Sequence, residues 1–143
     1  MKVTLVQSTP NPIETIVDIA KICYDSTPKD YMGLVKHLYA SGHHSVFEHI
    51  YFTFKIEGIS RACSHQLVRH RMCSFTQRSQ RYCSEDNSKY VIPPSMKHLA
   101  FAEDIEDIFD WYRDYQGLDI PNEDARYILP NACRTDLYIC LVT

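Results

Sequence analysis

An α+β fold, with a central, largely antiparallel sheet flanked by helices, is predicted by three features of this 143-residue chain. Residues 50–57 alternate apolar and polar side chains, which indicates a strand with one buried and one wet face, as in antiparallel sheets. Residues 13–20 and 97–116 repeat apolar side chains at helical spacing. The length suggests a single domain, 1–143, and 45% hydrophobic with 23% charged residues is typical of a soluble globular protein.

The first part of the chain predicts one strand and two helices. Residues 2–7 alternate and indicate a short strand. Asn11 can cap a helix that has Pro12 at its first position, where a missing N–H costs nothing. A second helix is expected to begin within residues 27–30 in the same way and to end near Gly42.

The middle and the end of the chain predict further short elements. Gly58 is expected to end the strand at 50–57, and Ser60 to cap a helix that runs towards Arg69. A polar turn, an extended segment, a short helix stopped by proline and a buried strand follow at 84–88, 91–95, 121–130 and 137–142. The helix at 97–116 is expected to turn inward Leu99, Ile105, Ile108, Trp111, Tyr112 and Tyr115.

The most unusual stretch is residues 61–81, which hold five arginines, two histidines and no acidic residue in a chain of net charge −3. Crowded guanidinium groups repel one another unless an anion lies between them, and the planar fork of Arg matches phosphate best. The cations at 69–71 also suit the C-terminal end of the preceding helix, but that dipole does not explain Arg78 and Arg81. The stretch therefore predicts a site for a phosphorylated small molecule.

The segment 43–49 carries three histidines and a glutamate, and three interpretations remain open. They could ligate a metal, although no Cys or Asp partner has ligand-like spacing. They could simply be hydrogen-bonding loop residues. The loop could also contact a ligand that the arginine-rich stretch holds.

The six cysteines form no Cys-x-x-Cys pair, so we expect free, buried thiols and no metal centre. The N-terminus is too short and polar for a signal peptide, and no apolar run approaches the ~18 residues of a membrane span. A cytoplasmic location without a membrane partner is expected.

Three segments resemble flavin-dependent thymidylate synthases. The signature of that family is matched by Arg69, His70, Arg71, Ser74, Ser79 and Arg81, followed by Tyr82. Residues 43–49 resemble the loop before the first long strand of the family, and residues 123–132 resemble its helix that ends in Leu-Pro. Thr76 stands where many members carry Asn, and the family continues beyond Thr143. The resemblance implies the fold of that family with its C-terminal part missing here.

The resemblance also implies an activity, the reductive methylation of dUMP to dTMP. Methylenetetrahydrofolate would donate the carbon, and FAD reduced by NADPH would supply the hydride, so no cysteine nucleophile is needed. A homotetramer with shared active sites is implied. The implied FAD contacts are Ser45, Glu48, Arg69, His70, Arg71 and Thr76. The implied dUMP contacts are Gln66, Gln77, Arg78, Ser79, Arg81 and Arg126.

The chemistry of Ser79 favours binding over nucleophilic attack, because the arginines around it supply no general base. One alternative is a non-catalytic module in which residues 61–81 bind nucleic acid and Phe75 and Tyr82 stack on bases. The mild net negative charge argues against general nucleic-acid binding, and no nucleic-acid partner is expected. Another alternative is an inactive fragment of the synthase.

Overall fold

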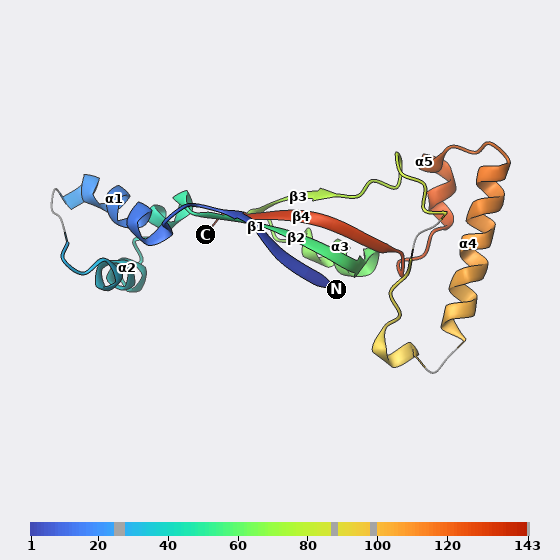
Figure 1. Ribbon diagram of the computed structural model, residues 1–143, viewed down its shortest axis with the longest axis horizontal. Coiled ribbons are helices and arrows are strands. Elements are labelled where there is room, and N and C mark those ends of the chain that lie inside the picture. The colour runs from blue at the N-terminus through green and yellow to red at the C-terminus, as the bar shows by residue number, and fades with distance from the viewer. Residues whose placement is uncertain (25–27, 87–88, 98–99, 143) are drawn as a thin grey trace.

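The computed structural model describes residues 1–24, 28–86, 89–97 and 100–142, and a four-stranded sheet runs through its centre. The strands are β1 (Lys2–Ser8), β2 (Tyr51–Ser60), β3 (Cys73–Gln77) and β4 (Arg134–Val142). Their order is β1-β2-β4-β3, and every neighbouring pair is antiparallel. Figure 1 shows the sheet as a narrow band between two helical lobes. The predicted antiparallel α+β class is confirmed.

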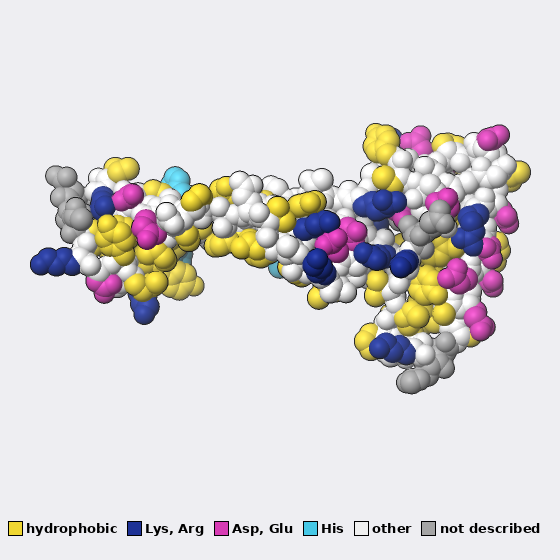
Figure 2. All heavy atoms as spheres, in the orientation of Figure 1, with side chains coloured by type: hydrophobic (Ala, Val, Ile, Leu, Met, Phe, Trp, Pro, Cys, Tyr) yellow, Lys and Arg dark blue, Asp and Glu magenta, His cyan; other side chains and the backbone are white. Residues whose placement is uncertain are grey.

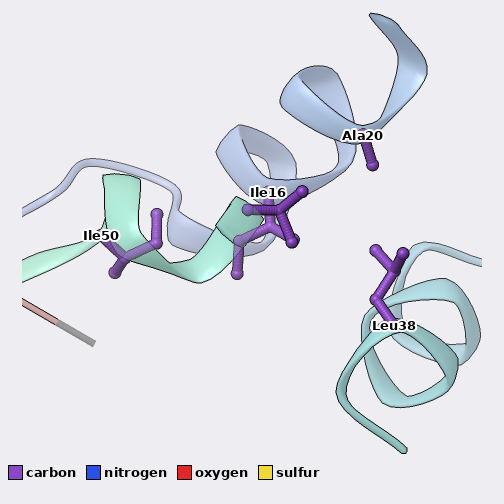
Figure 3. Close-up of a cluster of buried hydrophobic side chains, with 5 residues drawn as sticks. Ile16, Ala20, Leu38 and Ile50 are labelled. Atoms are coloured by element: carbon purple, nitrogen blue, oxygen red, sulfur yellow. The ribbon is translucent and has the colours of Figure 1, made fainter. Parts of the chain in front are cut away.

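The first lobe contains α1 (Pro12–Tyr24), α2 (Tyr31–Ala40) and the 3-10 helix η1 (His44–His49). The Gly33 N–H donates to Asp30 Oδ1 at 2.9 Å, so Asp30 caps α2. The predicted cap residue Thr27 lies outside the described residues. Buried side chains from α1, α2, η1 and the residue before β2 meet between the elements, as Figure 3 shows for Ile16, Ala20, Leu38 and Ile50.

β2 does not end at Gly58, so that prediction was wrong. The strand continues to Ser60, and its register against β4 shifts between Ile56 and Ile59. Gly58 has φ 75°, a conformation that glycine adopts without strain, and its N–H donates to Asp136 Oδ1 at 2.7 Å. The extra residue is absorbed as a bulge, which bends the strand instead of terminating it.

β3 is an edge strand that our reading of the sequence missed. It pairs with β4 from Cys73 opposite Leu141 to Gln77 opposite Leu137. Cys73 and Phe75 pack on the buried cluster of the sheet, whose members are Ile59, Leu137 and Ile139. The arginine-rich stretch is therefore built around a strand that is anchored by its inward side chains.

The helix predicted after Ser60 is confirmed as α3 (Arg61–Leu67). The Cys63 N–H donates to Ser60 Oγ at 3.1 Å, so Ser60 is the N-cap. Leu67 packs on the same cluster as Phe75. α3 thus covers the inner face of β2, β4 and β3 and leads the chain directly into the arginine-rich stretch.

The second lobe contains η2 (Pro94–Met96), α4 (Phe101–Gly117), α5 (Asn122–Ala125) and η3 (Arg126–Ile128). α4 begins at Phe101 and not at residue 97, and Leu99 lies outside the described residues. Ile105, Phe109 and Tyr112 are buried, whereas Trp111 and Tyr115 are 54% and 42% exposed, against the prediction. The spacing 105, 109, 112 follows one line of the helix, and Trp111 lies outside that line.

β4 begins at Arg134, three residues before the predicted strand at 137–142. Its first residues lie beside the second lobe, because Arg134 N–H donates to Lys89 O at 2.8 Å and Tyr90 bridges to Cys133. Cys133 packs with Ile105 and Phe109 of α4 in a buried cluster. None of the helices in the described ranges is long and apolar enough to cross a membrane.

All six cysteines are free, but they are not all buried as expected. Cys133 is fully buried, whereas Cys23 and Cys63 are exposed. Burial, with a smaller contribution from the nearby Glu85, raises the pKa of the Cys133 thiol to about 12. The thiol of Cys133 is therefore protonated and shielded in the folded chain.

We expect iodoacetamide to label Cys63 in the native protein and to leave Cys133 unmodified. At about pH 8.5, near the ordinary thiol pKa, an exposed cysteine is partly thiolate, whereas Cys133 stays protonated because its pKa is raised. Peptide mapping by mass spectrometry would measure both sites. Labelling in denaturant serves as the control, and equal labelling of both sites in the native protein would contradict the burial of Cys133.

Candidate functional site

The residues expected to contact ligands lie along β3, from one end to the other. The N–H groups of Arg69 and His70 donate to Gln66 O and Leu67 O, each at 3.2 Å, so the turn of α3 continues to His70. The chain then enters β3 at Cys73 and leaves it at Gln77. Five strand residues span about 17 Å. The segments 69–71 and 79–81 therefore lie at opposite ends of one strand.

The start of β3 lies beside the histidine-rich loop that forms η1. Glu48 of η1 and Met72, just before β3, line a common pocket of about 350 Å³. The rings of Tyr39 and His44 stack there with centroids 5.3 Å apart, and Phe47 meets Tyr39 edge-on. The remaining lining residue is Val142. An apolar, aromatic pocket beside polar groups suits a flat organic ligand.

This geometry bears on the three interpretations of the loop at 43–49. The loop and the arginine-rich stretch do meet at one pocket, as the ligand-contact interpretation requires. No group of three or more His, Cys, Asp or Glu side chains in the described ranges is placed to hold a metal ion. Ser45 is exposed on η1, and Thr76 is exposed on the outer face of β3.

The cationic side chains that precede β3 have no counter-ion among the described residues. Arg69, His70 and Arg71 are exposed, and none of the three forms an ion pair within the part of the chain that the structure describes. Their charges can therefore be balanced by an anionic ligand. Figure 2 shows the opposite charges at the far lobe, where acidic side chains lie along α4.

Gln77 has a structural role that sequence reasoning missed. Its Nε2 donates to Ser64 Oγ at 2.8 Å and to Thr135 Oγ1 at 3.1 Å, and both hydroxyl residues are buried. The side chain therefore ties the end of β3 to α3 and β4. Gln66, by contrast, is exposed on α3. Direct substrate contacts from Gln66 and Gln77 stay predictions.

Arg78 is directed towards the second lobe. Its Nε donates to Glu85 Oε1 at 3.3 Å, and its Nη2 donates to Ser84 O at 3.0 Å. Glu85 is 1% exposed, although the sequence predicted only a polar turn at 84–88. A contact from Arg78 to a nucleotide stays a prediction, and the carboxylate that Arg78 contacts could not be found from the sequence.

Arg81 and Arg126 are brought together by Glu123. Arg81 donates from Nε and Nη2 to Glu123 Oε2 at 3.2 and 2.8 Å, and Arg126 Nε donates to Glu123 O at 3.0 Å. The hydrogen bond to Glu123 raises the pKa of Arg81, and both side chains of this pair are about half exposed. Two guanidinium groups, from residues 45 positions apart in the sequence (126 − 81), therefore bond to the same glutamate, Arg81 to its carboxylate and Arg126 to its backbone carbonyl.

Ser79 and a shallow hollow complete this end of β3. Ser79 Oγ accepts a hydrogen bond from the Arg81 N–H at 3.3 Å. A hollow of about 220 Å³ is lined by Gln80, Arg126 and Tyr127. Arg126 lines this hollow, and Ser79 and Arg81 flank its lining residue Gln80 in the chain. Arginine side chains and a serine hydroxyl in this arrangement can hold a phosphate through charge-assisted hydrogen bonds. Glu123 is the residue of this group that the sequence did not indicate.

The nucleic-acid alternative loses one of its two stacking rings. Phe75 packs on the buried cluster of the sheet, so its face is not available to a base. Tyr82 remains 81% exposed, and the Arg81 guanidinium lies over its ring at 5.7 Å. The predicted stacking role of Phe75 was therefore wrong.

Comparisons with known proteins agree with the signature along β3. The family model of the thymidylate synthase complementing protein matches residues 4–141. A flavin-dependent thymidylate synthase of Geobacter sulfurreducens is 38% identical over 158 residues, covering 99% of this chain and 68% of the relative. The enzyme of the same name from Pyrococcus abyssi is 38% identical over 160 residues, covering 99% and 66%.

Solved structures show the same fold. Thymidylate synthase X from Helicobacter pylori, crystallised with FAD and dUMP, superposes with a TM-score of 0.78 at 20% identity, covering 99% of this chain and 78% of that one. The UMP/dUMP methylase PolB from Streptomyces cacaoi, bound with 5-Br dUMP, gives a TM-score of 0.82 at 23% identity, covering 99% and 72%. The chain therefore belongs to the thymidylate synthase complementing protein family, the family of the flavin-dependent thymidylate synthases.

Proposed function

We propose that the protein takes part in the reductive methylation of dUMP to dTMP, with methylenetetrahydrofolate as the carbon donor and NADPH as the reductant of FAD. The observation that carries this proposal is that β3 separates the residues of the family signature into two groups, 69–71 and 79–81. One end offers cations without described counter-ions beside an aromatic pocket. At the other end Arg81 and Arg126 both bond to Glu123, and Arg126 lines a small polar hollow. These two ends suit a flavin cofactor and a nucleotide monophosphate.

The nucleotide end binds and orients the substrate. Arg81 and Arg126 can donate parallel hydrogen bonds to phosphate oxygens, and Ser79 Oγ lies beside the Arg81 N–H. Gln66, Gln77 and Arg78 complete the proposed set of dUMP contacts. No side chain of this set needs to act as a nucleophile, and Ser79 Oγ accepts a hydrogen bond from the Arg81 N–H, as a binding residue can.

The residues at the other end fit an anionic, flat cofactor. Arg69, His70 and Arg71 carry positive charge without described counter-ions, and Glu48 and Met72 line the aromatic pocket. We propose that Ser45, Glu48, Arg69, His70, Arg71 and Thr76 hold FAD. Bound FAD would supply the hydride for the reaction. Positive charge from the protein beside a flavin favours its anionic reduced form.

The two ends of β3 lie about 17 Å apart, and this distance supports an active site that is shared between copies of the chain. Reacting atoms must approach each other to about 3–3.5 Å. Two ligands that a single chain held at the two ends of β3 would stay too far apart to react. A homotetramer in which the flavin end of one copy faces the nucleotide end of another would solve this. A cytoplasmic location is part of this proposal.

The test of the proposed function is release of tritium from C5 of [5-³H]dUMP. The protein is loaded with FAD and given NADPH and methylenetetrahydrofolate under anaerobic conditions. Tritium release together with dTMP formation is expected. A protein that binds FAD and dUMP but releases no tritium would leave a binding role or an inactive fragment as the explanation.

Replacing Glu123 with glutamine is expected to tighten dUMP binding slightly. Glu123 holds Arg81 in the ligand-free chain, so a phosphate must compete with its carboxylate. Exposed ion pairs are weak, which limits the gain to about fivefold at most. Isothermal titration with dUMP measures the change, with Asp110→Asn, on the exposed face of α4, as the control. A loss of affinity would instead show that Glu123 itself helps to bind the substrate.

A further inference from the structure

A buried carboxylate lies behind the nucleotide end of β3. Glu85 is 1% exposed, although glutamate is almost never fully buried unless it is paired. Its Oε1 accepts a hydrogen bond from Arg78 Nε at 3.3 Å, and the half-buried Arg61 of α3 interacts with it electrostatically. Neither Arg61 nor Glu85 belongs to the ligand contacts proposed above.

Hydrogen bonds from both its side chain and its backbone hold Arg78 in this arrangement. Its guanidinium contacts Glu85 and the Ser84 carbonyl, its N–H donates to Asp136 O at 3.0 Å, and its carbonyl accepts from Arg61 Nη2 at 2.7 Å. Arg78 directly precedes Ser79 and lies three residues before Arg81. Whatever fixes Arg78 therefore fixes the start of the turn that presents the nucleotide contacts.

Glu85 also connects this turn to α5. Its N–H donates to the hydroxyl of Tyr112, a fully buried residue of α4, at 3.2 Å. The Tyr112 hydroxyl makes a long hydrogen bond of 3.5 Å to Asn122 Oδ1, which Gln116 Nε2 also contacts at 2.6 Å. Asn122 is the first residue of α5, the helix that carries Glu123 and leads to Arg126. One polar network, buried at Glu85 and Tyr112 and partly exposed elsewhere, thus spans both halves of the nucleotide end.

Stability alone is a poor explanation for such a network. Replacing a buried ion pair by apolar residues of similar volume is often neutral or stabilising, because the desolvation penalty rivals the attraction. The same pair does fix distances and orientations, since each partner must be satisfied in a single geometry. Burial raises the pKa of Glu85 while Arg78 and Arg61 lower it, so these cations help to keep the carboxylate charged.

We infer that Glu85 is a positioning residue for nucleotide binding: its carboxylate holds Arg78 while its backbone N–H is held by Tyr112, and the turn at 79–81 is thereby kept in register with α5, so that Arg81 and Arg126 face the same phosphate. This inference rests on the proposed function, which identifies the anion as the phosphate of dUMP. Glu85 itself is buried away from the ligand and acts only through its neighbours.

The test is the variant Glu85→Gln in the full chain, which keeps the shape of the side chain and removes its charge. Affinities for dUMP and for FAD are measured separately, by titration calorimetry and by flavin fluorescence. We expect dUMP to bind about 10-fold more weakly, since small misplacements of binding groups are costly, and FAD to bind within about twofold of the wild type. The selective loss distinguishes positioning from general destabilisation.

Two controls separate the role of Glu85 from neighbouring effects. Asp86→Asn changes the adjacent, exposed carboxylate and is expected to leave both affinities unchanged. Phe109→Leu destabilises the core of the same lobe without touching the polar network and is expected to keep its dUMP affinity at a temperature where it is folded. If this variant lost dUMP binding as Glu85→Gln does, the effect would be structural and the inference would fail.

A double variant tests the route through Arg78. Arg78→Gln removes the same ion pair at its partly exposed partner and, under the proposed function, one dUMP contact as well. It should therefore lose dUMP binding selectively and by at least as much as Glu85→Gln, also if Glu85→Gln does not fold. Glu85→Gln combined with Arg78→Gln should be no worse than Arg78→Gln alone, because the ion pair is already lost in that single variant. Folded variants with unchanged dUMP affinity, or with equal losses of dUMP and FAD, would overturn the inference. A wild-type protein that bound FAD but no dUMP would overturn the proposed function as well.

Discussion

Phe109→Ala is expected to lower the free energy of unfolding by about 3–5 kcal/mol, the usual range for deleting a buried aromatic ring. Phe109 is 1% exposed and packs with Ile105 and Cys133, and its ring stacks on Tyr90 at a centroid distance of 6.3 Å. This cluster attaches α4 to the residues that precede β4. Loss of the Phe109 ring leaves a cavity between the second lobe and the sheet, and the lobe cannot close that cavity without moving α4.

Trp111→Ala is the matched control, because it removes a larger ring from the same helix. Trp111 is 54% exposed, so its removal is expected to cost less than about 1 kcal/mol. Urea unfolding followed by circular dichroism, at one protein concentration, measures both variants. Equal losses for the two variants would mean that α4 presents a different face to the core, namely the face that the sequence pattern suggested.

The sequence was informative about elements whose pattern is local. The strand at 50–57, the Ser60 cap and the helix α1 each follow from neighbouring residues, and the structure confirms them. The predicted buried and wet faces of the strand are not distinct, because residues 51–58 are all partly buried. Trp111 shows the limit of this reasoning. Several aromatic residues crowd α4, and the packing of Cys133 and Tyr90 against Phe109 decides that Phe109 is buried and Trp111 is not.

β3 was missed for a different reason. Its five residues alternate inward and outward side chains, but the arginines on both sides dominated the interpretation of the stretch. The bulge at Gly58 was missed because a glycine with positive φ can end a strand or kink it, and only the pairing with β4 decides. In both cases the deciding information is the partner strand, whose paired residues lie 60 or more positions away (137 − 77).

The candidate site, like the fold, could be predicted from the sequence only in part. The residue types that suit an anion, Arg69–Arg71 and Ser79–Arg81, are evident from the sequence, and β3 explains why they form two groups. The carboxylates that hold Arg78 and Arg81 were not found. Glu85 is buried only because α4 covers it, and Glu123 reaches Arg81 across 42 residues of chain. Counter-ions at such separations depend on the tertiary fold.

Arg81→Ala is expected to weaken dUMP binding by roughly 10- to 150-fold, the range for losing charge-assisted hydrogen bonds to a bound anion. FAD binding is expected to change little, because Arg81 lies beyond the far end of β3 from the aromatic pocket. The KM for dUMP should rise more than kcat falls, since Arg81 holds the phosphate and not the reacting carbon. Titration calorimetry with dUMP and flavin fluorescence measure the two affinities in the same preparation.

Arg113→Ala is the control for the loss of one positive charge. Arg113 pairs with Asp110 on α4 and its Nη1 donates to the Asp86 carbonyl, so it belongs to the same lobe but not to the nucleotide end. It should leave the dUMP affinity within about twofold of the wild type, because a distant exposed charge is screened by salt.

Combining Arg81→Ala with Glu123→Gln separates two roles of Arg81. If Arg81 binds phosphate directly, the double variant stays as weak as Arg81→Ala, because releasing a partner from Glu123 is useless once that partner is gone. If Arg81 only anchors α5 through Glu123, both single variants should weaken dUMP binding alike, and the assignment of Arg81 to the phosphate would be wrong.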